Sequence, residues 1–102
     1  MIHVIATIEV VRGKRDAFLA EFRQVVPLVR AEAGCLDYGP TVDLDTGLGA
    51  QLPVRDHVVT VVERWESLEA LRAHLQAPHM AEYRERVKGL VAGVRLQVLQ
   101  PV

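Results

Sequence analysis

Residues 57–83, HVVTVVERWESLEALRAHLQAPHMAEY, contain a complete change of secondary-structure pattern and decide the fold of the chain. The stretch opens with a nearly continuous apolar run that ends at Trp65, which is typical of a buried β-strand. Ser67 can then cap a short helix, because its hydroxyl oxygen can accept a hydrogen bond from a free backbone N–H of the first turn. Pro78 favours the start of a second helix. The sequence therefore predicts a strand followed by a helix in two parts.

The segment before this stretch predicts a first strand and a first helix. Residues 2–11 are short and rich in β-branched side chains, as strands are. Residues 13–32 carry one apolar stripe at helical spacing, made of Phe18, Phe22, Val25 and Val29. Pro27 lies inside that stripe and predicts a kink or a split of the helix. Gly34 predicts a left-handed stop after it.

Two more strands complete the pattern. Residues 35–44 and 94–99 predict the second and fourth strands, and 43–56 (DLDTGLGAQLPVRD) form a connection that is long for a hairpin. We expect that connection to be mobile or to act as a lid. The order β-α-β-β-α-β predicts an α+β, ferredoxin-like antiparallel sheet with the helices on one face. In this arrangement the first and third strands are central, and they are the most apolar here.

Composition narrows the class of protein. The 102 residues suffice for one domain, 1–102, and half of them are hydrophobic. The net charge is −1, with Lys and Arg spread out, so no basic stripe predicts a nucleic-acid partner. The single Cys35 excludes an internal disulfide and a Cys-rich zinc site. The apolar run at the N-terminus is too short for a membrane span, so we expect a cytoplasmic protein with no membrane partner.

The first strand also predicts a partner. Both of its faces carry apolar side chains, whereas a strand with one face in water should alternate more cleanly. Helices cover only one face of a ferredoxin-like sheet. We therefore expect a homodimer whose sheets pack face to face.

Four stretches resemble the antibiotic biosynthesis monooxygenase family, which includes quinol monooxygenases. They are VRGKRDAFLAEF after the opening strand, RAEAGCLDY at 30–38, VVERWESLEALRAHL at 61–75 and APHMAEY at 77–83. Together with the strand order they cover nearly the whole chain. The resemblance implies a dimeric α+β barrel. It also implies oxidation of a small quinol or polyphenol by O2, often with no metal, flavin or haem. Such chemistry needs a base, a dry pocket and room for a planar ring.

Two histidines are the leading catalytic candidates. His74 flanks the apolar stripe of its helix, where an imidazole can act as a base or donate a hydrogen bond to a substrate oxygen. His79 lies at the apolar edge of the next helix, just after Pro78. For each, the alternative is a structural histidine bonded to the backbone or serving the helix start. Their spacing across a proline break is not a recognised metal-ligand spacing, so no metal site is predicted.

Five other residues are also candidates for the site. Trp65 could form a flat wall on which a substrate ring stacks, and a core role is equally open. Glu63 shares its strand face and should pair with a histidine or an arginine, because burying an unpaired carboxylate is costly. Tyr83, Tyr38 and Thr7 are further substrate-binding candidates.

The sequence disfavours haem chemistry and leaves two other functions open. Haem-degrading relatives use an Asn on the first strand and a His late in the last helix, whereas this chain has Thr7 on the strand and no His in 83–88. A non-catalytic barrel that binds a small hydrophobic ligand fits the same residues. So does an isomerase or cyclase that needs no oxygen.

Overall fold

The computed structural model describes residues 1–102 and contains four strands and three helices in the predicted order. The strands are β1 (Ile2–Val10), β2 (Cys35–Thr41), β3 (Val58–Trp65) and β4 (Val91–Leu99). The helices are α1 (Arg15–Arg30), α2 (Leu68–Leu75) and α3 (Pro78–Val87). All strand pairs are antiparallel, and the sheet order is β2-β3-β1-β4. The predicted fold class and the central position of β1 and β3 are therefore confirmed.

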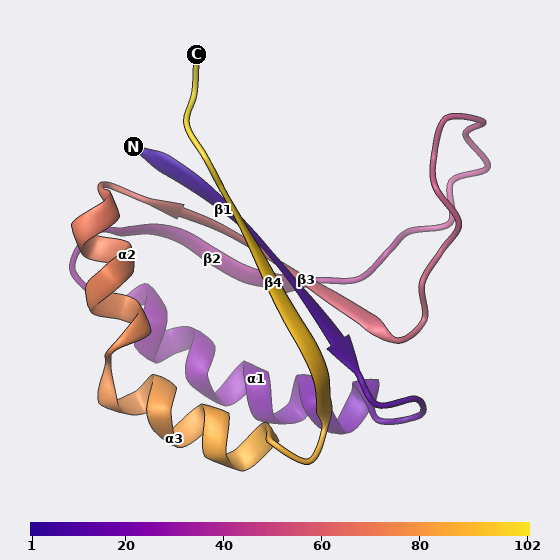
Figure 1. Ribbon diagram of the computed structural model, residues 1–102, viewed down its shortest axis with the longest axis horizontal. Coiled ribbons are helices and arrows are strands. Elements are labelled where there is room, and N and C mark those ends of the chain that lie inside the picture. Colours follow the sequence, from indigo (N-terminus) through magenta and orange to yellow (C-terminus); the bar gives the residue numbers. More distant parts are fainter.

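The helices lie together on one side of the sheet (Figure 1). Alternate residues of β1 point toward them, and Val4, Ala6, Ile8 and Val10 are all buried. The predicted stripe of α1 meets this face: Phe18, Phe22, Val25 and Val29 are buried in the same core. Hydrophobic burial on this face is the main stabilising contribution to the layered fold.

The helix boundaries follow local signals. Ser67 caps α2 as predicted, because its Oγ accepts a hydrogen bond from Ala70 N at 3.1 Å. Pro78 begins α3. The predicted split at Pro27 is wrong: α1 continues through it to Arg30. Proline removes only one backbone donor, and the buried side chains on either side of it hold the helix together.

Gly34 has the predicted left-handed backbone, with φ of +82°. It lies in the turn between α1 and β2, four residues beyond the end of the helix. Its Cα packs against α2, since an added Cβ would lie 2.6 Å from Ala70 Cβ. The glycine therefore sets both the turn and the close approach of α2.

The uncovered face of the sheet is more polar than expected. The pairing register places Ile5, Val62 and Leu99 on it, among Thr7, Thr60, Arg64, Arg95 and Gln97. The expectation of an apolar second face is thus only partly met. The apolar side chains of β4 (Val94, Leu96 and Val98) pair with Ile8, Ala6 and Val4, so they lie on the helix side. They remain 58%, 46% and 43% exposed, because α1 and α2 pack on β2 and β3 instead.

Residues 43–56, hereafter the arm, project from the end of the sheet on the side away from the helices (Figure 1). Internal hydrogen bonds hold the arm in shape: Arg55 Nε donates to Asp43 Oδ2 at 2.9 Å, and Gln51 Nε2 donates to Leu44 O at 2.6 Å. At its base, Arg15 Nη1 donates to Arg55 O at 3.3 Å. The second strand ends at Thr41, three residues earlier than predicted, because the chain enters the arm shortly after it.

Candidate functional site

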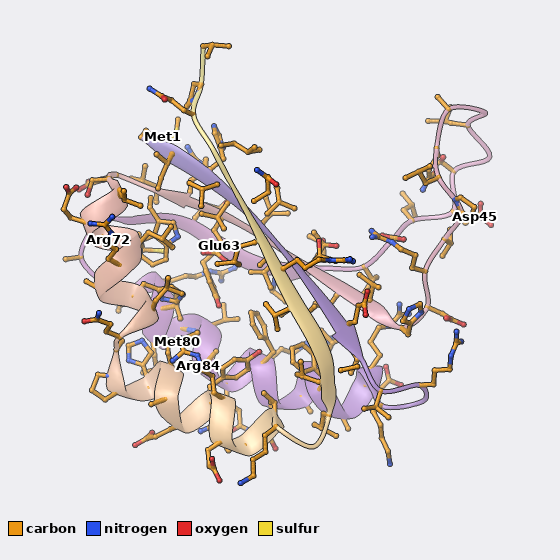
Figure 2. All side chains as sticks on the ribbon, viewed as in Figure 1. Met1, Asp45, Glu63, Arg72, Met80 and Arg84 are labelled. Atoms are coloured by element: carbon orange, nitrogen blue, oxygen red, sulfur yellow. The ribbon has the colours of Figure 1, made fainter.

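A cavity of about 410 Å³ lies between the sheet and the helices α2 and α3. Twelve of its 16 lining residues are hydrophobic, and the other four are Glu63, His74, Arg84 and Lys88. Figure 2 shows Glu63 on the sheet and Met80 and Arg84 on α3, on either side of this interior. No residue of the arm lines the cavity. A mostly apolar cavity with a few polar groups is the usual form of a small-molecule site.

His74 lies in this cavity wall with one ring nitrogen held by a carboxylate. Its Nδ1 is 3.0 Å from Glu32 Oε2, and the residue is only 2% exposed. A carboxylate can only accept, so Nδ1 carries the proton and Nε2 has a free lone pair. Nε2 has no protein partner, although every fully buried side-chain nitrogen and oxygen has one. Because His74 lines the cavity, Nε2 opens into it.

Glu32 also binds the second histidine. His79 Nε2 donates to the same Oε2 at 2.7 Å, so one carboxylate oxygen joins His74 on α2 to His79 on α3. His79 does not line the cavity. Burial lowers the pKa of His74, and the hydrogen bond and negative charge of Glu32 partly oppose that effect. Glu32 thus fixes the tautomer of His74 and makes its imidazole more basic than burial alone would allow.

Glu63 is a buried carboxyl group with one side in the cavity. It is 4% exposed, and its Oε1 accepts a hydrogen bond from Trp65 Nε1 at 2.9 Å. Burial raises its pKa to about 7, with the Trp65 hydrogen bond acting in the opposite direction. The expected pairing of Glu63 with a histidine or an arginine is wrong. Residues two apart on a strand share a face, which brings Trp65 to it instead.

The remaining predicted residues divide into two groups. Tyr38 and Tyr83 line the cavity, and burial raises the pKa of both phenols, so they stay protonated at neutral pH. Trp65 is fully buried outside the cavity lining, with its ring centroid 4.7 Å from that of His74. It therefore packs behind the histidine. Thr7 lies on the uncovered face, paired with Thr60 and Arg95, because odd-numbered residues of β1 point that way.

Sequence reasoning missed Glu32, Arg84 and Lys88. Glu32 belongs to the turn after α1 and is 42 and 47 residues from the two histidines, so no periodicity connects them. Its only signal was a carboxylate within the RAEAGCLDY stretch. Arg84 lies on α3, and Lys88 follows its last residue. Charged residues are common on the solvated face of any helix, so nothing in the sequence distinguishes these two.

Neither a metal-binding cluster nor a membrane-crossing helix is present in residues 1–102. No three His, Cys, Asp or Glu side chains are grouped so that they could hold a metal ion. A membrane-crossing helix needs roughly 20 apolar residues. None of α1, α2 and α3 meets the requirements of length and apolar character.

Comparison with known proteins identifies a family. The sequence model of the family described as "Antibiotic biosynthesis monooxygenase" matches residues 1–86. A protein of Escherichia coli named "Probable quinol monooxygenase YgiN" is 44% identical over 103 residues, which cover 99% of this chain and 98% of that protein. A protein of the same name from Shigella flexneri matches equally well.

Solved structures show the same fold. PA3566 from Pseudomonas aeruginosa superposes with a TM-score of 0.81 at 28% identity, covering 99% of this chain and 93% of that one. Rv0793 from Mycobacterium tuberculosis gives a TM-score of 0.80 at 28% identity, covering 99% and 94%. The matches extend through β4, beyond the part of the chain that the family model covers.

Proposed function

This chain belongs to the antibiotic biosynthesis monooxygenase family, and on that premise we propose that it oxidises a small quinol or polyphenol with O2. The observation that carries the proposal is His74, whose free Nε2 opens into an apolar cavity while Glu32 holds Nδ1. A base in a mostly apolar cavity suits this reaction, which begins with removal of a proton from the substrate. The name of the Escherichia coli relative supports the substrate class.

In the proposed mechanism His74 Nε2 accepts the proton of a substrate hydroxyl. The resulting imidazolium is stabilised by Glu32, whose carboxylate accepts from Nδ1. The protonated Tyr38 and Tyr83 hydroxyls and Glu63 line the same cavity and can orient the substrate oxygens. Twelve hydrophobic residues line the cavity, which favours binding of a planar ring.

The anion then supplies the electrons for oxygen. One electron passes from the phenolate to O2, and the radical pair combines into a hydroperoxide on the ring carbon. Loss of water from that hydroperoxide leaves a quinone carbonyl. One oxygen atom ends in the product and the other in water, so the substrate itself provides all electrons. We therefore propose a reaction independent of metal, flavin and haem.

The proposal extends to the assembly. We propose a single domain over residues 1–102, because β4 completes the sheet beyond the family match at 1–86. A second copy would cover the mixed uncovered face of the sheet as a homodimer. We propose that the protein acts in the cytoplasm, which suits its single unpaired Cys35.

The test is oxygen uptake by metal-stripped protein given a panel of hydroquinones and naphthols. We expect oxygen uptake by the wild type. In His74→Ala the rate of uptake should fall at least about a hundredfold, which is the usual contribution of a general base. His57→Ala is the matched control, since His57 precedes β3 and does not line the cavity. Equal uptake by both variants would refute the role of His74.

Two other functions are separated by the same panel. Tight binding of a naphthol without any oxygen uptake would indicate a binding protein. Product formation under argon would indicate an isomerase or cyclase, in which His74 moves a proton and no oxygen is consumed. No feature of the structure specifically favours ligand binding alone or an isomerase reaction.

A further inference from the structure

The arm and the edge strand β4 each carry apolar side chains that nothing in the chain covers. On the arm, Leu44, Leu48 and Leu52 are 73%, 69% and 82% exposed. The hydrogen bonds within the arm hold these leucines on an ordered projection. An ordered projection with three exposed leucines is an unusual surface for a protein that stays alone.

The edge strand is the second unpartnered surface. β4 is nine residues long and pairs only with β1, so its other edge has free backbone donors and acceptors. Val94, Leu96 and Val98 are exposed on its helix side, and the first two also line the cavity. Proteins usually cover or interrupt a long apolar edge strand, because it otherwise promotes aggregation. This strand forms an open wall of the candidate active site.

We infer that the arm of one copy packs against the β4 edge of a second copy and completes the wall of its cavity. A two-fold dimer requires a surface and its complement on the same chain, and the arm and β4 provide such a pair. The arm lies on the side of the sheet away from the helices, where the second copy would sit (Figure 1). From there it can pass around the partner's edge strand, since β4 is the last strand of the sheet.

The charges of the two surfaces are complementary as well. The arm contains three aspartates and one arginine, a net charge of −2 from −3 and +1. The cavity lining that includes Val94 and Leu96 also includes the cations Arg84 and Lys88, of which Lys88 is paired with Glu85 of its own chain. Asp45, far from the helices in Figure 2, has no partner within its own chain. Attraction between Asp45 on the arm and Arg84 at the partner's cavity, neither of which has an ion-pair partner in its own chain, favours the same docking orientation in each half of the dimer.

The experiment compares dimer dissociation by sedimentation velocity over a dilution series. The test variant is Leu44→Ser/Leu48→Ser/Leu52→Ser, and the control is Leu28→Ser, which changes a leucine on α1 that is 52% exposed. We expect the triple variant to dissociate at least about a hundredfold more readily, because each dimer loses two copies of the leucine contact. The control should match the wild type. Unchanged far-ultraviolet circular dichroism spectra confirm that all proteins are folded, since a weaker dimer by itself lowers the melting temperature.

A cross-linking experiment identifies the acceptor surface. In a Cys35→Ala background, protein with only Leu48→Cys is mixed with protein with only Val94→Cys and treated with a short bis-maleimide. We expect a mixed dimer to form faster than either homodimer. Three results overturn the inference: a monomeric wild type, a triple variant that dimerises normally, or cross-links between arms alone.

This inference goes beyond the proposed oxidation and is tested without it. A wild-type dimer that ignores the leucine substitutions would refute the role of the arm and leave the chemistry untouched. Absence of oxygen uptake would refute the chemistry and leave the dimer measurements valid. If the oxidation and the docking of the arm are both correct, the triple variant should also have a raised KM with a smaller change in kcat, because its cavity wall is incomplete.

Discussion

At the scale of single residues, the candidate site depends on the opposing effects of burial and Glu32 on His74. Burial lowers the pKa of the imidazole, and the Glu32 carboxylate raises it again through a 3.0 Å hydrogen bond and its charge. A neutral imidazole is needed to accept a proton, and a nearby anion is needed to stabilise the cation that forms. Glu32 is therefore a positioning residue that acts through His74.

Glu32→Gln tests that role. The amide keeps the size of the side chain and removes its charge, so the pKa of His74 should fall further. The acidic limb of the kcat/KM profile then moves to lower pH, because the histidine stays neutral to a lower pH. We expect kcat at neutral pH to fall about tenfold to a hundredfold, since the base is weaker. An acidic limb that stays in place would contradict the role of Glu32, even if activity fell.

Glu63 predicts a pH-dependent stability. Its pKa is about 7 in the folded protein and 4.5 as an ordinary glutamate, so between these values the folded state holds the extra proton. Stability contributed by the neutral carboxyl is present below pH 4.5 and is lost as the pH rises through 7. The shift corresponds to about 3 kcal/mol.

Glu63→Gln should therefore raise the free energy of unfolding at pH 8 by up to about 3 kcal/mol, and change it little at pH 4.5. The amide oxygen can still accept from Trp65 Nε1, which keeps the packing comparable. Urea unfolding at the two pH values measures the difference. An equal effect at both values would mean that ionisation of the buried carboxyl does not determine the stability.

The sequence identified much of the cavity wall and missed its organising carboxylate. Helical periodicity placed His74 beside the apolar stripe of its helix, and strand alternation placed Glu63 on the same face as Trp65. The same alternation puts Thr7 on the outer face. Trp65 follows the pattern but lies behind His74, because a strand pattern gives the face and not the depth of burial. The role of Glu32 depends on a tertiary contact that no local pattern encodes.

At the scale of elements, the turn at Gly34 connects α1, β2 and α2. Its φ of +82° suits glycine, and an added Cβ would meet Ala70 Cβ at 2.6 Å. Both conditions must be met for α2 to approach the sheet and place His74 over the cavity. Any side chain at this position would therefore introduce both backbone strain and a steric clash with α2.

Gly34→Ala should lower the free energy of unfolding by about 2–4 kcal/mol, from strain at positive φ together with overpacking. Gly13→Ala is the matched control. Gly13 has a φ of +80°, and its added Cβ would meet nothing within 4 Å, so only the strain remains. Chemical unfolding of both variants separates the two effects. Equal losses would show that the contact with Ala70 is unimportant.

Element order was predictable, whereas element ends were less so. The periodicity of apolar residues changes clearly from two to 3.6 along 57–83, and the caps at Ser67 and Pro78 act locally. Pro27 misled the prediction, because tertiary packing of α1 outweighs the loss of one backbone hydrogen bond. Strand β2 ends three residues earlier than predicted, and β4 begins three residues earlier than predicted. Strand ends depend on pairing with neighbouring strands more than on the propensity of single residues.

At the scale of the whole molecule, the distribution of exposed apolar side chains is the feature that the sequence could not predict. The two apolar faces of the first strand indicated a surface that needs a partner. The register of β4 decides where that surface lies, and it places Val94, Leu96 and Val98 at the edge of the cavity instead of on the open face. A shift of one residue would have reversed this arrangement. Assembly and active site are therefore connected through one strand.

The central claim is that this chain transfers one oxygen atom from O2 to a quinol or polyphenol in the cavity of His74. The most direct measurement is a reaction of metal-stripped protein with a naphthol under oxygen-18 gas, with mass analysis of the quinone and the water. We predict one labelled oxygen atom in each quinone and one in water, with labelled quinone reduced at least about a hundredfold in His74→Ala. Unlabelled quinone accompanied by hydrogen peroxide would contradict the claim, because O2 would then only accept electrons and the second quinone oxygen would come from water.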